Sequence, residues 1–138
     1  MAERLSFDTT YLIDAQQELR KPAPLRWPLK RPALDFLRTR PDCIFCISVI
    51  AVGEFVEGFP DQADPRLVRI LQSSRILPVD TQVALLYAQQ ARRLRRSGQL
   101  IGSNDLWIAA TAMRHEIPLV TRNTEHYRRV QGLNVITY

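Results

Sequence analysis

Three acidic side chains that are far apart in the sequence each lie near the end of a predicted strand or at the start of a helix. Asp8 closes a short strand predicted at residues 5–8, Glu54 lies one helical turn past the second strand, and Asp105 heads a helix. Asn123 follows a later strand. Crowded carboxylates repel one another and resist burial, so a cation is their natural compensation. These residue types therefore predict a metal site.

The donors in this set are oxygens, which suit the hard ions Mg²⁺ and Mn²⁺. Mg²⁺ commonly takes one or two carboxylates and completes its octahedral shell with water and with phosphate oxygens of a substrate. Such a site activates a water molecule for in-line attack on a phosphodiester and stabilises the charge that develops. The predicted chemistry is therefore phosphodiester hydrolysis.

Strands and helices alternate along the chain, which predicts an α/β protein with a parallel sheet covered on both faces. In such sheets ligands bind outside the carboxyl ends of the strands, where the acids are expected. The predicted strands cover residues 5–8, 43–49, 75–79, 118–121 and 134–138. The predicted helices cover residues 10–19, 33–40, 51–59, 64–74, 80–98 and 105–113, with a helical turn at 124–130.

The helix headed by Asp105 is almost wholly apolar and small from Leu106 onward, which is typical of a helix buried on most sides. An acid at this position could simply complement the helix dipole, an effect worth roughly 0.3–1 kcal/mol at a surface site. Ser103 or Asn104 is expected to cap the helix, which leaves Asp105 available for another role. Trp107 is expected to pack in the interior.

Two other segments are interpreted as structural rather than catalytic. Residues 21–32 hold four prolines and are predicted to form an irregular excursion, because proline removes a donor and disfavours helix in the preceding residue. Cys43 and Cys46 have a C-x-x-C spacing, but positions three apart in a strand point to opposite faces. They are expected to be structural thiols, and no second Cys or His pair completes a zinc site.

The length and charge of the chain limit the classes of function that it can have. The 138 residues suit a single domain spanning 1–138 with its own hydrophobic core. The net charge of +5 is compatible with a polyanionic partner but does not demand one. The apolar runs are too short to span a bilayer, and no hydrophobic signal core follows Met1. We therefore expect a cytoplasmic protein with no membrane partner.

Four segments, in their order and spacing, resemble the PIN-domain family of ribonucleases, in particular the VapC-type toxins of type II toxin–antitoxin systems. They are FDTTYLID, ISVIAVGEFVEG, SNDLWIAATA and PLVTRNTEHYRRVQGLNVITY, and together they cover most of the chain. The resemblance implies a three-layer PIN-like α/β fold with a central parallel sheet flanked by helices. It also implies a Mg²⁺- or Mn²⁺-dependent endoribonuclease, a cognate VapB-type antitoxin and a homodimer.

Carried over motif by motif, the resemblance gives Asp8, Glu54 and Asp105 the acidic metal-site positions of the family. Thr10, two residues past Asp8, matches a position where the family often has a small polar side chain that lines the site. The predicted catalytic set is these three acids together with Asn123.

Asn123 is a departure from the family pattern. In the sequence TRN it occupies the position where many relatives carry a fourth acid, as in TRD. Its amide offers an oxygen without the charge, so we expect one tightly held ion rather than two. Glu125 or His126 could contribute instead, although neither occupies the motif position, and in such positions histidines commonly face solvent.

Arginines supply the predicted contacts to substrate. Arg122 lies beside Asn123 and is expected to contact a phosphate within the site. The segment ARRLRRSGQ lies on a helix that leads toward Asp105, and its residues Arg92, Arg95 and Arg96 are predicted RNA contacts. A solvated helix face is the alternative for any one of them.

Other classes of function are left open or disfavoured by particular residues. A catalytically weak PIN-like protein that binds RNA is the alternative that Asn123 favours. A phosphatase with an Asp-x-Asp nucleophile is disfavoured, because Thr10 stands where the second acid belongs. No glycine-rich phosphate loop follows any strand, which disfavours nucleotide binding. Asp14, Asp35 and Glu116 are expected on the surface, and Asp80 or Thr81 as a helix cap.

Overall fold

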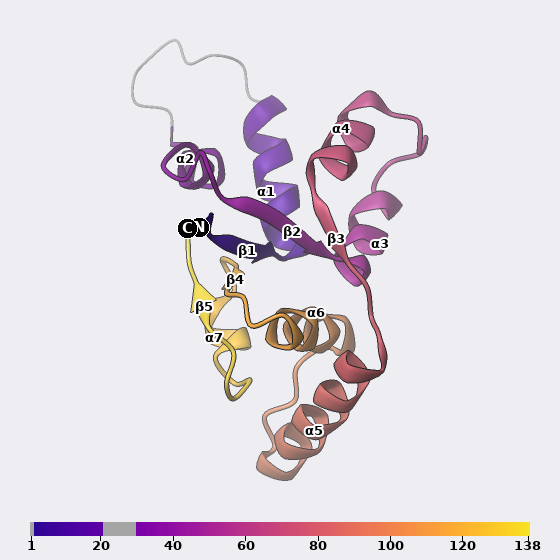
Figure 1. The fold of residues 1–138 in the computed structure, drawn as a ribbon, viewed down its shortest axis with the longest axis vertical. Helices are drawn as coiled ribbons and strands as arrows, with labels where there is room; N and C mark the ends of the chain where they lie inside the picture. Colours follow the sequence, from indigo (N-terminus) through magenta and orange to yellow (C-terminus); the bar gives the residue numbers. More distant parts are fainter. Residues whose placement is uncertain (1, 21–29) are drawn as a thin grey trace.

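The computed structural model describes residues 2–20 and 30–138 (Figure 1). Its strands form one parallel sheet in the order β3-β2-β1-β4-β5. The predicted α/β class, a central parallel sheet flanked by helices, is confirmed. The strands are β1 (Arg4–Phe7), β2 (Ile44–Ser48), β3 (Arg75–Leu77), β4 (Leu119–Val120) and β5 (Val135–Ile136).

Helices cover both faces of the sheet (Figure 1). α1, α2 and α4 lie on the upper side in this view, and α5 and α6 lie on the lower side. α3 follows β2 and packs against both α1 and α6. The helices are α1 (Thr9–Arg20), α2 (Pro32–Arg38), α3 (Val49–Glu57), α4 (Pro65–Ser73), α5 (Thr81–Ser97), α6 (Ser103–Arg114) and α7 (Thr124–Tyr127).

The regular elements are shorter at several ends than the sequence pattern predicts. β3 ends before Pro78, and β5 covers two residues of the predicted 134–138. Cys43 lies just outside β2, and both cysteines are free thiols, as expected. Of the proline-rich segment, residues 21–29 lie outside the described residues. None of the described helices is long and apolar enough to cross a membrane.

The order of the strands creates a crevice at one place in the sheet. The chain runs outward from β1 to β2 and β3, and then crosses to the other side of β1 to add β4 and β5. The connections after β1 and after β4 therefore leave the sheet in different directions, and a crevice opens outside their carboxyl ends. Any ligand of this fold is expected there.

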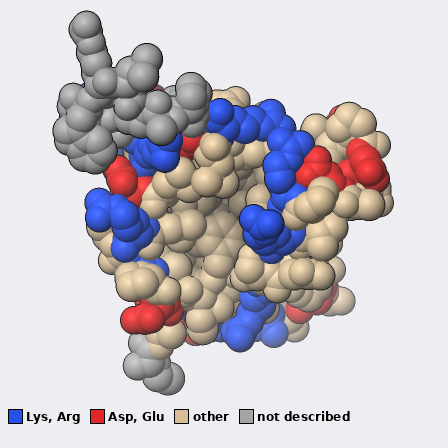
Figure 2. All heavy atoms as spheres, turned by 90° about the horizontal axis from the view of Figure 1, so that it is seen from above, with Lys and Arg blue, Asp and Glu red and all other residues tan. Residues whose placement is uncertain are grey.

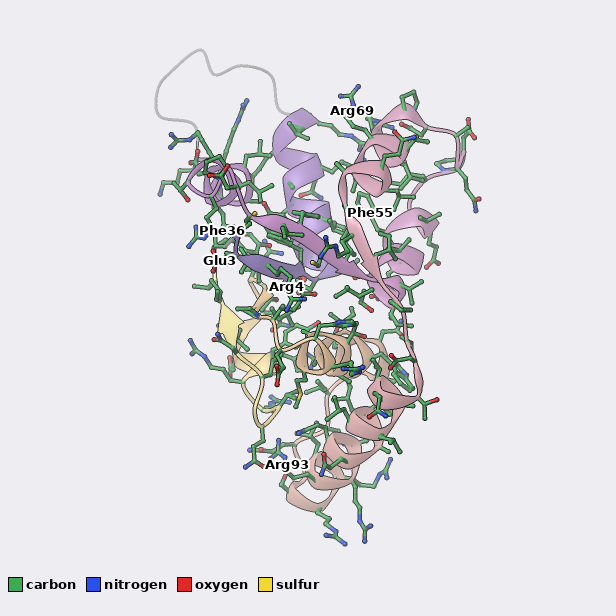
Figure 3. All side chains as sticks on the ribbon, viewed as in Figure 1. Glu3, Arg4, Phe36, Phe55, Arg69 and Arg93 are labelled. Carbon is green, nitrogen blue, oxygen red and sulfur yellow. The ribbon has the colours of Figure 1, made fainter. Side chains whose placement is uncertain are left out.

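The core of the upper layer is aromatic. Phe7 of β1 stacks on Phe45 of β2 with ring centroids 4.0 Å apart, and Tyr11 of α1 lies 4.5 Å from Phe7. Figure 3 shows Phe36 on α2 and Phe55 on α3, at either side of this layer. Offset and edge-to-face aromatic pairs add about 0.5–1.5 kcal/mol each beyond their area burial. This packing fixes the start of α1 against the sheet.

α6 is the most enclosed helix of the lower layer. Its residues from Ile108 to Ala112 are fully buried, and their small side chains allow close packing against α5. Trp107 stacks on Tyr87 of α5 at 3.8 Å, so the prediction that it packs is confirmed. The prediction of a Ser103 or Asn104 cap is wrong. The helix starts at Ser103 and its N-cap is Gly102, which has no side chain to accept a hydrogen bond.

Caps fix the other helices whose starts and ends position the site. Ser48 ends β2 and also caps α3, its hydroxyl accepting a hydrogen bond from the Ile50 amide at 3.2 Å. The chain thus passes from strand to helix without a loop. Asp80 caps α5 through the Val83 amide at 2.9 Å, and Gly98 ends it in the left-handed region, with φ of 68°. Asp80 was predicted as one of two possible caps.

α2 is held by an acid of another helix. Arg31 at its N-cap position makes no side-chain capping bond. Instead Glu18 of α1, which is 5% exposed, accepts hydrogen bonds from the amides of Ala33 and Leu34, each at 3.0 Å. This carboxylate therefore satisfies the first turn of α2 and ties α1 to it.

Glu18→Ala should lower the free energy of unfolding by about 2–3 kcal/mol, because it leaves two amide donors of α2 without their charged acceptor. Urea denaturation followed by circular dichroism measures this change. The control is Glu57→Ala on α3, an exposed acid whose loss should change stability by less than about 0.5 kcal/mol. Equal effects of the two substitutions would contradict this role for Glu18.

Candidate active site

Asp8 occupies the crevice between β1 and β4. It follows β1 directly and is 1% exposed. Its Oδ1 accepts a hydrogen bond from the Tyr11 amide at 2.9 Å, which caps α1. Its Oδ2 accepts from the hydroxyls of Thr10 at 2.8 Å and Thr121 at 2.5 Å. Thr121 follows β4, so this last bond joins the two strands at the point where the chain changes direction.

The electrostatic state of Asp8 is unusual for a carboxylate with three donors. Burial is the largest cause and raises its pKa above the ordinary value, and the nearby charge of Asp105 raises it further. The hydrogen bonds from Thr121, Tyr11 and Thr10 oppose this shift without cancelling it. Because a carboxylate accepts about four hydrogen bonds, roughly one acceptor position remains for another ligand.

Glu54 reaches the same region from α3. It lies on the second turn of that helix, and its Oε1 accepts a hydrogen bond from the Thr9 hydroxyl at 2.7 Å. Since Thr9 directly follows Asp8 in the chain, this bond holds the Glu54 carboxylate beside the start of α1. Glu57, one turn later on the same helix, is exposed.

Asp105 sits in the first turn of α6 and meets two side chains of α7. Its Oδ1 accepts a hydrogen bond from the Tyr127 hydroxyl at 3.1 Å. Its Oδ2 lies 3.2 Å from His126 Nδ1. The expectation that His126 faces solvent is therefore wrong. The histidine is held between Asp105 and the Asn123 amide, 3.1 Å away.

Tyr127 is a buried residue whose hydroxyl is influenced by the charges of all three acids. Its side chain is 1% exposed, and burial is the largest cause that raises the pKa of its hydroxyl. The charges of Asp8, Asp105 and Glu54 each raise this pKa further. The three acids are thus near enough to Tyr127 for their charges to raise this pKa, and Asp105 is the one that forms a hydrogen bond with its hydroxyl.

The donors present fit a hard divalent ion in type and charge. All three acids offer carboxylate oxygens, and no described Lys or Arg forms an ion pair with Asp8 or Glu54. Among residues 2–20 and 30–138, however, no three acid, histidine or cysteine side chains are grouped closely enough to hold an ion as they stand.

The positions predicted as a fourth ligand lie at the edge of this cluster. Asn123 is connected with Asp8 through Thr121, because its backbone amide donates to the Thr121 hydroxyl at 3.0 Å and that hydroxyl donates to Asp8. Glu125 is exposed and lines a hollow of about 360 Å³ with Asn123, His126 and Arg129. Of the two alternatives to Asn123, His126 is therefore the one in contact with an acid of the cluster.

Arg122 lies beside the site in a fixed position. Its Nη1 forms an ion pair with Asp14 Oδ2 at 3.3 Å, and the hydroxyl of Tyr138 donates to the same oxygen at 2.6 Å. Asp14 was expected on the surface, which is wrong, since its side chain is only 14% exposed. The Arg122 side chain is 63% exposed, so its guanidinium remains open to solvent.

The predicted contacts on α5 are separate from the acids. Arg92, Arg95 and Arg96 are exposed near the C-terminal end of this helix. Arg92 and Arg96 line a hollow formed by residues of α5. Arg93 and Gln90 connect α5 with the segment after α7. The Arg93 guanidinium donates to the carbonyl of Arg129, and Gln90 exchanges hydrogen bonds with the backbone of Gln131.

Sequence reasoning missed three residues that define this site. Thr121, Tyr127 and Thr9 donate to Asp8, Asp105 and Glu54 respectively. Thr121 follows a strand at the same edge as Asp8, which was the available signal. Tyr127 falls in a position that reads as buried and apolar, so its polar role depends on tertiary contacts alone.

Fold and site together define a doubly wound parallel α/β protein with an acidic cluster at its topological switch point. The sequence model of the PIN domain family matches residues 28–133. The chain belongs to the PIN domain family. The matched range includes Glu54, Asp105 and Asn123, and Asp8 lies before it.

Curated relatives agree with this family. The chain is 34% identical over 94 residues to Ribonuclease VapC10 of Mycobacterium tuberculosis, covering 68% of this chain and 71% of that protein. It is 29% identical over 93 residues to Ribonuclease VapC1 of Methanocaldococcus jannaschii, covering 67% and 68%.

Solved structures share the fold over nearly the whole chain. VapBC2 from Rickettsia felis, bound to a DNA fragment from its promoter, superposes with a TM-score of 0.81 at 21% identity, covering 97% of this chain and 98% of that chain. FitAcB from Neisseria gonorrhoeae superposes with a TM-score of 0.70 at 25% identity, covering 96% of each chain.

Asp8→Asn should stabilise the folded chain at neutral pH. Because folding raises the pKa of Asp8, the stability contributed by its protonated form is lost as pH rises from about 3.9 through the folded pKa. The neutral amide avoids this loss, so the variant should have the higher melting temperature at pH 7, and the difference should vanish near pH 3. A gain of about 1 kcal/mol corresponds to roughly 3–5 °C in a domain of this size.

The matched control is Asp42→Asn, which removes an exposed acid outside the site. Its melting temperature should follow that of the native chain at both pH values. A native chain that is more stable than Asp8→Asn at pH 7 would contradict the assignment of Asp8 as a buried, charge-strained carboxylate.

Proposed function

We propose that the chain is a Mg²⁺- or Mn²⁺-dependent endoribonuclease that hydrolyses RNA phosphodiester bonds and acts as the toxin of a toxin–antitoxin pair. The observation that carries the proposal is the set of hydrogen bonds that positions each acid. Thr121 binds Asp8 at the switch point of the sheet, Thr9 holds Glu54 beside the start of α1, and Tyr127 binds Asp105. The similarity to proteins named ribonuclease VapC supports the reaction class.

Asp8, Glu54 and Asp105 would hold the ion, with the Asn123 amide at the edge of its shell. A bound Mg²⁺ or Mn²⁺ lowers the pKa of water and stabilises charge on a phosphodiester. The other residues orient these carboxylates. Thr10, Thr121 and the Tyr11 amide fix Asp8, Thr9 fixes Glu54, and Tyr127 fixes Asp105.

Arg122 is proposed to bind a phosphate of the RNA next to the acids. Asp14 pairs with its guanidinium, and the preceding residue, Thr121, is held by its hydrogen bond to Asp8. Preorganised guanidinium groups form strong, paired hydrogen bonds with phosphate oxygens. The exposed guanidinium of Arg122 therefore presents positive charge at the rim of a negative site.

We propose a VapB-type antitoxin as the partner. The upper face of the molecule has an apolar groove of about 350 Å³ between α1, α2 and α4, lined by residues such as Leu12, Leu19, Leu34, Leu37, Phe45 and Ile70. Figure 2 shows this face, where tan surface is hollowed between blue groups of Lys and Arg. Tyr11 lines the groove and its amide binds Asp8, so a segment lying there would run along the helix that begins at the acidic site.

We also propose that two copies of the chain form a homodimer. Large apolar side chains are exposed on several elements, and they supply surface that an interface could bury. They are Ile13, Leu19, Val49, Ile76, Leu85 and Leu100. Sedimentation equilibrium of the free chain measures this assembly directly.

A catalytically weak protein that binds RNA is the second candidate. Two observations favour it: Asn123 removes one charge from the site, and the acids are not grouped as a ready ligand set. The two candidates differ in whether RNA is cut when Mn²⁺ is added.

The native chain should cleave single-stranded RNA in Mg²⁺ or Mn²⁺ and not in excess chelator. Asp8→Asn and Asp105→Asn should each lower the rate at least about 100-fold, because each removes a charge from the proposed ion site. Gel electrophoresis of labelled RNA measures the rate. The matched control is Glu57→Gln, which alters an exposed acid one turn from Glu54 and should leave the rate unchanged.

Cleavage that survives Asp8→Asn would point to a contaminating nuclease and would contradict the proposal. Binding of RNA without metal-dependent cleavage by the native chain would support the second candidate instead.

Asn123→Asp discriminates further between the two candidates. The added carboxylate should tighten Mn²⁺ binding. A bound ion stabilises the folded chain by about 2.7 kcal/mol when its concentration is 100 times its dissociation constant, and the melting temperature rises accordingly. If the missing charge limits catalysis, the cleavage rate should also rise. A variant that binds Mn²⁺ no better than the native chain would show that position 123 lies outside the ion's reach.

A further inference from the structure

α5 carries a charged hollow that the proposed active site does not use. Its volume is about 880 Å³, and it is lined by Ala88, Gln89, Arg92, Arg93, Arg96 and Ser97. We call this surface the α5 hollow. Three of its six lining residues are arginines, so the hollow carries positive charge.

The arginines of the α5 hollow differ in what they bind. Arg93 is half-buried, and it donates from Nε to Gln90 Oε1 at 3.3 Å and from Nη2 to the carbonyl of Arg129. Arg92 and Arg96 are exposed, and neither forms an ion pair with any described acid. Two guanidinium groups therefore remain available for a ligand while the third is part of the fold.

The charge of the α5 hollow selects the kind of ligand. A second copy bound about a two-fold axis would place this positive surface against itself, and like charges in contact oppose association. A polyanion instead gains from each available guanidinium and releases bound counterions. The hollow therefore fits a phosphate backbone better than another copy of the chain.

A series of contacts connects the α5 hollow with the acidic cluster. His126 lies against Asp105 and lines a second hollow with Asn123, Glu125 and Arg129. Arg129 Nη1 donates to the carbonyl of Leu100 at 3.2 Å, just before α6, and the Arg129 carbonyl accepts from Arg93. Figure 3 shows Arg93 near the lower end of α5, beside the segment that follows α7. Glu125 also lines this second hollow, so its charge is mixed and Arg129 supplies its positive side.

We infer that the α5 hollow binds the phosphate backbone of an RNA strand that extends from the acidic cluster past Arg129 to Arg92 and Arg96. The inference rests on the proposed ribonuclease function and adds a binding surface remote from the cut. Arg92 and Arg96 are one helical turn apart, about 6 Å along the axis. This separation is similar to that of successive phosphates in an extended strand. Backbone contacts position a strand without reading its sequence.

The test measures binding rather than cleavage, and it uses the full chain with Asp8→Asn so that the RNA stays intact. Fluorescence anisotropy with a fluorescein-labelled single-stranded RNA of about 20 nucleotides is recorded over a range of salt concentrations. Adding Arg92→Glu and Arg96→Glu should weaken binding at least tenfold at low salt. The slope of log affinity against log salt should fall by about 1.4, since each single-strand phosphate contact contributes about 0.7.

The matched control carries Arg69→Glu on α4 and Arg75→Glu on β3. Both residues are exposed, the change in net charge is the same, and neither residue lines the α5 hollow. This control should retain most of the affinity and the salt slope of the parent.

Equal RNA affinity and equal salt slope for the parent and the Arg92, Arg96 variant would overturn the inference. So would equal losses in the variant and its charge-matched control, or a changed sedimentation coefficient with unchanged RNA affinity. Metal-dependent cleavage by the native chain is scored separately, so the proposed ribonuclease function stands or fails independently of this surface.

Discussion

The hydrogen bond from Thr121 to Asp8 is the contact on which the arrangement of the site depends. It joins the residue after β1 to the residue after β4, the two strands between which the chain reverses its order in the sheet. Because the backbone leaves these strands in different directions, the carboxylate is enclosed between them rather than covered by a loop. Burial at that point raises the pKa of Asp8 and makes its charge sensitive to every neighbouring group.

Asp8 also has a structural role, because the same carboxylate that belongs to the acidic site caps a helix. One of its oxygens caps α1, and the other collects two hydroxyl donors. The start of α1, the end of β4 and the position of the acid are therefore set together. Glu54 is tied to the same helix start through Thr9, and Asp105 is tied to α7 through Tyr127. Polar contacts that each join two elements thus hold three mutually repelling acids near one another without a Lys or Arg among the described residues to pair with Asp8 or Glu54.

The strand-and-helix alternation and the acids at strand ends were predictable, because hydrophobic periodicity and sheet topology act through local sequence. Thr121 and Tyr127 were not identified as site residues, because a hydroxyl shows its partner only once distant elements are packed. Asp14 and His126 read as surface residues for the same reason, and their partners lie 108 and 21 positions away, respectively, in Arg122 and Asp105. The cap of α6 was assigned to a side chain, yet the helix begins at Ser103 after Gly102. That error came from boundary placement, which patterns determine poorly.

The arginines divide into those that hold the fold and those that are left to act on a ligand. Arg93 and Arg129 donate hydrogen bonds to backbone carbonyls, and Arg122 forms an ion pair with Asp14, a mostly buried acid. Arg92 and Arg96 have no such partner among the described residues, although they belong to the same run of sequence as Arg93. An unpaired positive surface makes no contact that stabilises the fold, and its like charges repel one another. A surface of this kind is best explained by a ligand whose own charge is negative along its length and whose path passes the acids.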